Sequence, residues 1–126
     1  MSLTIEQEER KELIETLKIA ERGGYKAYAH KESNYGYILN DDYVLYLIKN
    51  YYGLWDLSFV HKPSRNNDIM CSCYRNLLNV DLETIDKAFI IGCSNASIKK
   101  YKNSQEWFNN YWAKDDLDDI SKSPYY

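Results

Sequence analysis

The sequence has few cysteines, and their number and setting exclude a disulfide scaffold. Its 126 residues include three Cys, which is an odd number, and the first ten residues lack the apolar core of a signal peptide. We therefore expect reduced thiols and a cytoplasmic protein. The length fits one domain. The 44% hydrophobic and 28% charged residues are ordinary globular values, which excludes wholesale disorder.

Long apolar runs and an excess of positive charge are also missing. The longest wholly apolar run, from Tyr43 to Ile48, has six residues, whereas a bilayer-spanning helix needs about 20. We therefore expect no membrane segment. Sixteen basic residues against 19 acidic ones leave a formal charge of −3. This balance is unlike that of a duplex-binding domain, which carries a strong basic excess.

Catalytic motifs are absent as well. The five glycines lie where turns and helix ends need them, and no nucleophile elbow, Walker loop, HExxH or GxGxxG pattern occurs. Cys71 and Cys73 are a C-x-C pair for which Cys93, His61 and His30 are the available partners in a zinc site or a Cys/His nucleophile. Because this spacing is unusual for zinc, we interpret both thiols as core residues. We expect no catalysis, no metal and no cofactor.

Aromatic residues are what the sequence has in excess. Thirteen Tyr, three Trp and three Phe make up 15% of the chain. Aromatic side chains form stacking surfaces for unpaired bases, and they also form the centres of protein interfaces. Two binding functions therefore remain open.

The hydrophobic periodicity predicts a helix followed by strands. A Thr4–Gln7 capping box precedes apolar residues at helical spacing, and Gly23-Gly24 ends this helix. Alternation with a period of two and turn residues between the segments predict strands at 25–30, 35–39, 54–61 and 69–75. The β-branched and aromatic residues of 43–49 predict a further strand there. For residues 43–51 a helix remains an alternative. We prefer a strand because the flanking turns are about eight residues apart, which is typical of a meander.

Two further helices are predicted after the strands. Asp81 caps one that ends near Gly92, and Ser104 caps a short one whose aromatic residues, from Trp107 to Trp112, should dock on the sheet. Residues 114–126 are acidic, and we expect a mobile tail there. The expected architecture is an α+β domain over residues 1–113. It has an N-terminal helix, a mostly antiparallel sheet of four or five strands, and C-terminal helices packed on one face.

The candidate binding residues lie on the first two strands, at the end of the fourth strand and in the loop that precedes the fifth. They combine aromatic rings with basic groups, as single-strand binders do, and they are Tyr28, Tyr35, Tyr37, His61, Lys62 and Arg65. For nucleic acid, Lys26 and Lys31 would add positive charge. Our leading hypothesis is a protein partner bound by an aromatic-rich surface, and single-stranded nucleic acid is the alternative. An open sheet edge would also allow a homodimer.

The stretch Ser58-Phe59-Val60-His61-Lys62-Pro63-Ser64-Arg65 resembles a recurrent segment of small uncharacterised proteins from phages and mobile elements of low-GC bacteria. The resemblance extends loosely over residues 15–92, including GGYKAYAHKESNYGYI and NVDLETIDKAF. The loop departs from the glycine-rich continuation of these proteins, because it runs into Asn66-Asn67-Asp68. The resemblance implies an accessory protein of a mobile element and no known activity.

Overall fold

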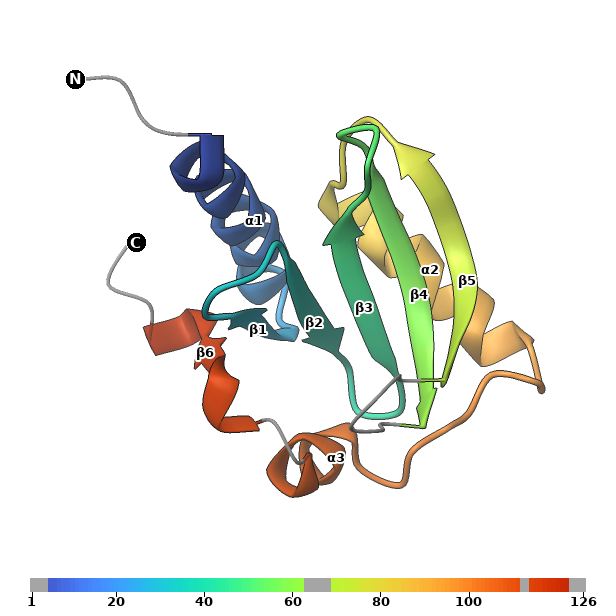
Figure 1. Ribbon diagram of the computed structural model, residues 1–126. Helices are drawn as coiled ribbons and strands as arrows, with labels where there is room; N and C mark the ends of the chain where they lie inside the picture. Colours follow the sequence, from blue (N-terminus) through green and yellow to red (C-terminus); the bar gives the residue numbers. More distant parts are fainter. Residues whose placement is uncertain (1–4, 63–68, 112–113, 123–126) are drawn as a thin grey trace.

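An antiparallel six-stranded sheet with helices on both faces forms the protein (Figure 1). The computed structural model describes residues 5–62, 69–111 and 114–122. The strand order is β5-β4-β3-β2-β1-β6. In chain order the elements are α1 Ile5–Arg22, β1 Lys26–His30, β2 Tyr35–Leu39, β3 Val44–Lys49, β4 Trp55–Lys62, β5 Ile69–Leu77, α2 Leu82–Ser94, α3 Ser104–Asn110, the 3-10 turns η1 Lys114–Asp116 and η2 Ile120–Lys122, and β6 Leu117–Asp119 between those turns.

The predicted α+β class is confirmed, and the ambiguous third segment is a strand. Residues 44–49 alternate between the two faces of the sheet, so that Leu45 and Leu47 enter one hydrophobic cluster and Val44 enters the other. A helix would place these neighbours around a cylinder instead of on two opposed faces. Residues 44–49 form a strand because successive side chains point to opposite faces of the sheet and both faces are buried.

Two hydrophobic clusters lie on opposite faces of the sheet. The main core, beneath α1 and α2, contains Leu17, Ile38, Leu57 and Ile85 among others. The second cluster lies beneath α3 and is mostly aromatic; we call it the aromatic cluster, and its buried members are Tyr28, Tyr37, Leu39, Val44, Val60, Tyr101, Trp107, Tyr111 and Leu117. We expected both C-terminal helices on one face. They lie on opposite faces instead: α2 contributes Ile85 and Phe89 to the main core, and α3 contributes Trp107 to the aromatic cluster.

The caps of the two C-terminal helices differ in how well the sequence predicts them. Asp81 caps α2 as predicted, since its Oδ1 accepts hydrogen bonds of 2.8 Å from both the backbone amide and the hydroxyl of Thr84. These two hydrogen bonds lower the pKa of Asp81. The cap of α3 is Asn103, whose side chain accepts from Gln105 N at 3.0 Å. The predicted cap, Ser104, is instead buried and donates its hydroxyl to the Asn40 carbonyl.

The helix α2 extends two residues beyond Gly92, where we expected it to end. Gly92 is buried against Phe59, and a Cβ placed there would lie 2.8 Å from the Phe59 ring. Gly92 therefore does not mark the end of the helix. It allows α2 to approach β4 closely, because it has no Cβ.

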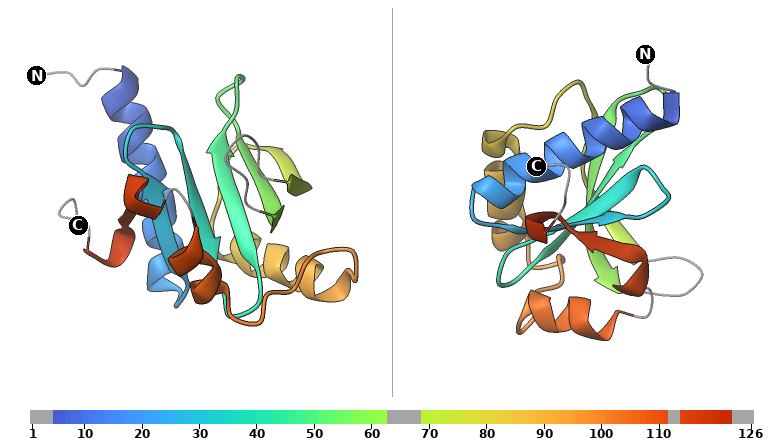
Figure 2. Two further views of the ribbon diagram at one scale, coloured as in Figure 1. Left: turned by 60° about the horizontal axis from the view of Figure 1, so that its bottom comes forward. Right: turned by 90° about the vertical axis from the view of Figure 1, so that its left-hand side faces the viewer.

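The C-terminal residues correct a second expectation. We predicted a mobile tail over residues 114–126, of which 123–126 lie outside the described residues. Residues 114–122 instead lie along the edge of β1 (Figure 2), and we call this segment the C-terminal strap. Its central strand β6 pairs with β1, with Tyr28 opposite Asp119 and His30 opposite Leu117. Leu117 and Ile120 are buried. Two apolar residues among acids are too few to give a periodic signal.

The opposite edge of the sheet, strand β5, is irregular. Its pairing with β4 shifts register at three places, between Trp55/Leu57, Leu57/Ser58 and Val60/Lys62. Near its end Asn76 adopts a left-handed backbone conformation with φ 58°, which is uncommon outside glycine. Such bulges bend an edge strand away from a regular ladder.

Replacing Gly36 by alanine is expected to destabilise the sheet. A Cβ at this position of β2 would lie 2.5 Å from the Tyr28 carbonyl oxygen and 2.8 Å from Leu17 Cδ1. The neighbouring strand must shift to make room, which should lower the free energy of unfolding by about 2 kcal/mol or more. Urea denaturation measures this, with Ser58→Ala as a control expected to change it by less than about 0.5 kcal/mol. Equal midpoints for wild type and Gly36→Ala would contradict the packing described.

Candidate interaction site

Two of the three predicted tyrosines are buried beneath α3. Tyr28 is 4% exposed and Tyr37 is 1% exposed. The Tyr28 ring stacks on Phe108 with centroids 3.8 Å apart, and the Tyr37 hydroxyl lies 3.1 Å from that of Tyr111. Burial also raises the pKa of Tyr28. Neither ring is accessible for stacking on bases in this structure.

Tyr35 is half-buried and keeps part of its ring at the surface. It lies beside His30, with ring centroids 4.7 Å apart, and beside Tyr46 at 5.3 Å. The His30 Nδ1 accepts from the backbone amides of Glu32 at 3.2 Å and Ser33 at 3.1 Å. The neutral imidazole therefore carries its proton on Nε2.

The basic part of the predicted site can be placed only in part. His61 and Lys62 are the last residues of β4, and Arg65 lies outside the described residues. The structure thus brings Tyr28, Tyr35 and Tyr37 together on two paired strands. It leaves only Tyr35 among these three with a half-exposed ring.

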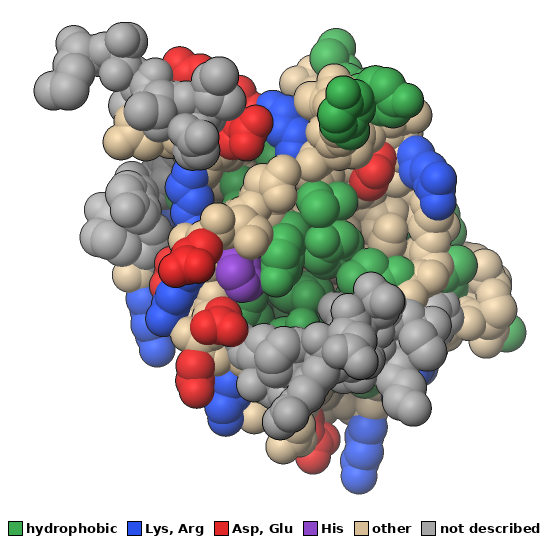
Figure 3. All heavy atoms as spheres, viewed as in Figure 1, with side chains coloured by type: hydrophobic (Ala, Val, Ile, Leu, Met, Phe, Trp, Pro, Cys, Tyr) green, Lys and Arg blue, Asp and Glu red, His purple; other side chains and the backbone are tan. Residues whose placement is uncertain are grey.

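The most exposed aromatic side chains are ones that the sequence analysis did not select. Tyr51 is 97% exposed and Tyr52 is 78% exposed in the turn between β3 and β4, and Leu78, just after β5, is 77% exposed. We call these three residues the hairpin tip patch. Figure 3 shows hydrophobic side chains gathered over this end of the molecule. Exposed apolar patches of this kind mark interaction sites more often than scattered single residues do.

A hydrogen-bond network holds the turn that carries the patch. The Asn50 Oδ1 accepts from the amides of Tyr52 at 2.9 Å and Leu54 at 3.1 Å. The Asn50 Nδ2 donates to Asp56 Oδ1 at 3.1 Å and to Asn76 Oδ1 at 2.7 Å. The Asn76 amide also donates to Asp56 Oδ1, at 2.9 Å. The two tyrosines therefore lie on a turn whose backbone these bonds hold.

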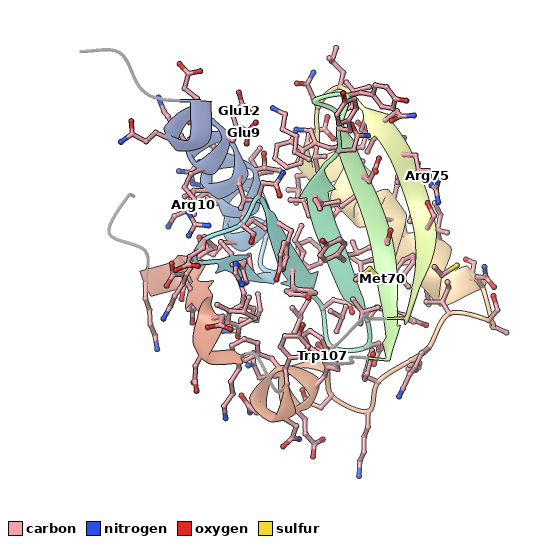
Figure 4. All side chains as sticks on the ribbon, viewed as in Figure 1. Glu9, Arg10, Glu12, Met70, Arg75 and Trp107 are labelled. Carbon is pink, nitrogen blue, oxygen red and sulfur yellow. The ribbon has the colours of Figure 1, made fainter. Side chains whose placement is uncertain are left out.

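An ion pair joins the base of the hairpin to α1. Lys49 forms an ion pair with Glu12, and its ammonium lies 5.3 Å from the centre of the Trp55 ring. Arg75 lies on β5, on the other side of the hairpin from Glu9 and Glu12 (Figure 4). Its Nε donates to Ser72 Oγ at 3.1 Å. The turn thus has Arg75 on one side and, on the other, Glu9 together with the ion pair of Glu12 and Lys49.

Cys73 is poorly placed for nucleophilic chemistry. Cys71 and Cys73 are partly buried against the main core, and burial raises the pKa of Cys73 to about 11. A thiol with so high a pKa is a weak nucleophile near neutral pH. Within the described ranges no group of three His, Cys, Asp or Glu side chains could hold a metal ion.

A short stretch of sequence could have identified the hairpin tip patch. Tyr51 and Tyr52 precede Gly53, which has φ 75°, and this position of the turn favours glycine. Two aromatic residues in a tight turn have no core to enter. We considered Tyr51 only within the segment 43–51, although a turn at a hairpin tip exposes its side chains.

No family model, curated protein or solved structure matches this chain. None of the helices in residues 5–62, 69–111 and 114–122 is both long and apolar enough to cross a bilayer.

Replacing Asn50 by alanine is expected to loosen the tip while the rest of the sheet stays folded. The change removes four side-chain hydrogen bonds of Asn50, and each is worth about 1 kcal/mol at most when it is partly exposed. Amide exchange at Tyr52 and Leu54, followed by NMR, should become at least about tenfold faster. Asn95→Ala removes a similar local bond to Ser97 elsewhere and should leave both amides unchanged. Unchanged exchange in Asn50→Ala would show that the turn does not depend on this network.

Alkylation should distinguish the cysteines. Because the pKa of Cys73 is about 11, roughly one molecule in a thousand carries its thiolate at pH 8. Iodoacetamide should therefore modify the exposed Cys93 well before Cys73. Between pH 8 and pH 10 the Cys73 rate should rise about a hundredfold, because the thiolate fraction rises by that factor. Peptide mass spectrometry measures both rates, and equal rates at pH 8 would refute the burial of Cys73.

Proposed function

We propose that this is a non-catalytic accessory protein of a phage or another mobile element, and that it binds a protein partner through the hairpin tip patch. One observation carries the proposal: Tyr51, at 97% exposure, lies on a turn that Asn50 holds by side-chain bonds to its backbone. The mobile-element setting rests on the sequence resemblance around His61 and Lys62. The partner class rests on the chemistry of the tip.

Tyrosine at such a position suits a protein interface. Its ring offers a large apolar area with few rotatable bonds, and its hydroxyl forms a hydrogen bond when the ring is buried by a partner. Tyr51 and Tyr52 lie edge to face, with centroids 5.7 Å apart, so that they form one convex feature. Residues of this kind are enriched among those that dominate binding energy.

Single-stranded nucleic acid is the second candidate. The exposed rings of Tyr51 and Tyr52 would also stack on unpaired bases, and Arg75 lies on the neighbouring strand. The acidic residues of α1 on the other side of the hairpin weaken this alternative, because phosphate contacts supply most of the affinity of such binders. The chain as a whole carries a formal charge of −3.

The double substitution Tyr51→Ser and Tyr52→Ser tests the proposal. It should leave the urea midpoint within error, since both side chains lie outside the core, and it should weaken capture of a partner by at least about tenfold. Affinity capture followed by quantitative binding to the purified partner measures the effect. Ile90→Ser on α2 is the matched control, because Ile90 is also an exposed apolar residue, at 63%.

A partner that binds the double variant as tightly as wild type would contradict the proposal. Binding of a fluorescent single-stranded oligonucleotide, lost in the double variant and weakened steeply by salt, would favour the second candidate instead.

A further inference from the structure

The C-terminal strap joins the two faces of the sheet. It follows α3, which covers the aromatic cluster, crosses the edge of β1 and ends against α1 (Figure 2). Leu117 enters the aromatic cluster. Ile120, which is fully buried, enters the main core on the other face. Each hydrophobic cluster therefore receives one apolar anchor from the strap.

The edge of β1 recognises the strap by polar contacts as well. The backbone amide of Lys31 donates to the Asp116 carbonyl at 2.9 Å. Arg10 on α1 lies between the strap and β1 (Figure 4) and donates to the His30 carbonyl. Its Nη2 also lies 3.2 Å from Asp118 Oδ2. The segment that these contacts hold is extended and has an acid, Asp118, directly after its first apolar anchor, Leu117.

Several features weaken the attachment of the strap to the sheet. The strand β6 has three residues, whereas β4 has eight and β5 nine. The Asp118 side chain is 46% exposed, so that water screens its pair with Arg10. An open hollow of about 160 Å³ lies beside the strap, lined by Glu21, Lys26, Asp119 and Ser121 among others.

The charge of the strap also opposes its attachment. Four aspartates lie within residues 115–119, and among the described residues Arg10 is the one cation that forms an ion pair with any of them. Like charges this close repel one another and disfavour compact packing. The apolar anchors and Arg10 must therefore outweigh this repulsion.

We infer that the edge of β1, together with Arg10, is a strand-acceptor site that the chain's own strap fills and that the same segment of a second copy can enter by exchange. The site accepts an extended segment with apolar residues at its first and fourth positions and a carboxylate at its second. A second copy carries this segment in its own residues 117–120, and exchange reproduces every contact described. The exchange needs no residue of the hairpin tip patch and is independent of the proposed function.

A peptide supplied separately from the chain tests the acceptor site. The receptor is the full chain with Leu117→Ser and Ile120→Ser, which removes both anchors of its own strap and leaves β1 and Arg10 intact. The probe is a fluorescent peptide of residues 114–122, followed by anisotropy. We expect it to bind this receptor at least about tenfold more tightly than wild type, whose site is occupied. A peptide carrying the same two serines should bind at least tenfold more weakly.

The contribution of Arg10 to binding can be measured separately from that of the two apolar anchors. Adding Arg10→Ala to the receptor should weaken the native peptide several-fold but should not change the affinity of a peptide with Asp118→Asn. Equal binding of the native and serine peptides, or no binding to a receptor that circular dichroism shows to be folded, would overturn the inference. If the double substitution unfolds the chain, Leu117→Ala is the milder receptor, because it weakens one buried anchor and keeps Asp118, and the same tenfold gain over wild type is expected of it. Equal affinity for that variant and wild type would then overturn the inference.

Discussion

The packing of aromatic rings between the sheet and α3 is the contact on which much of this structure depends. With seven residues, α3 is too short to be stable in isolation. Its position comes from Phe108 stacked on Tyr28 and from Trp107, which points toward the sheet and meets Tyr37 edge to face (Figure 4). Because the chain continues from α3 into the C-terminal strap, the same contact also brings the strap to the edge of β1.

This packing changes the meaning of the aromatic content. A chain rich in tyrosine suggests a binding surface, yet most of the sheet tyrosines form a second core on a face that many antiparallel sheets leave to water. The hydroxyl groups do not prevent burial, because Tyr28 bonds Gln105 and Tyr101 bonds the Val60 carbonyl. What distinguishes Tyr51 and Tyr52 is therefore position and not residue type.

The sequence was informative where the signal is local or periodic. Alternation, turn spacing and β-branched or aromatic content located β1 to β5, and Asp81 three residues before Thr84 located the start of α2. The sixth strand, the division of the helices between two faces and the burial of Tyr37 depend on contacts between distant residues. No window of sequence contains Arg10 and Asp118, which lie 108 residues apart. For the same reason the candidate tyrosines were found together, but their exposure was not predictable.

The irregular edge at β5 has a consequence for the behaviour of the protein at high concentration. A flat edge strand has a regular row of unpaired backbone amides and carbonyls with which a strand of another molecule can pair. Sheets can extend from such edges into fibrils. At β5 the register shifts against β4, the left-handed Asn76 and the exposed Arg75 interrupt that row. A fibril would have to remove these bulges before it could grow there, so the sheet ends at β5 by its own geometry.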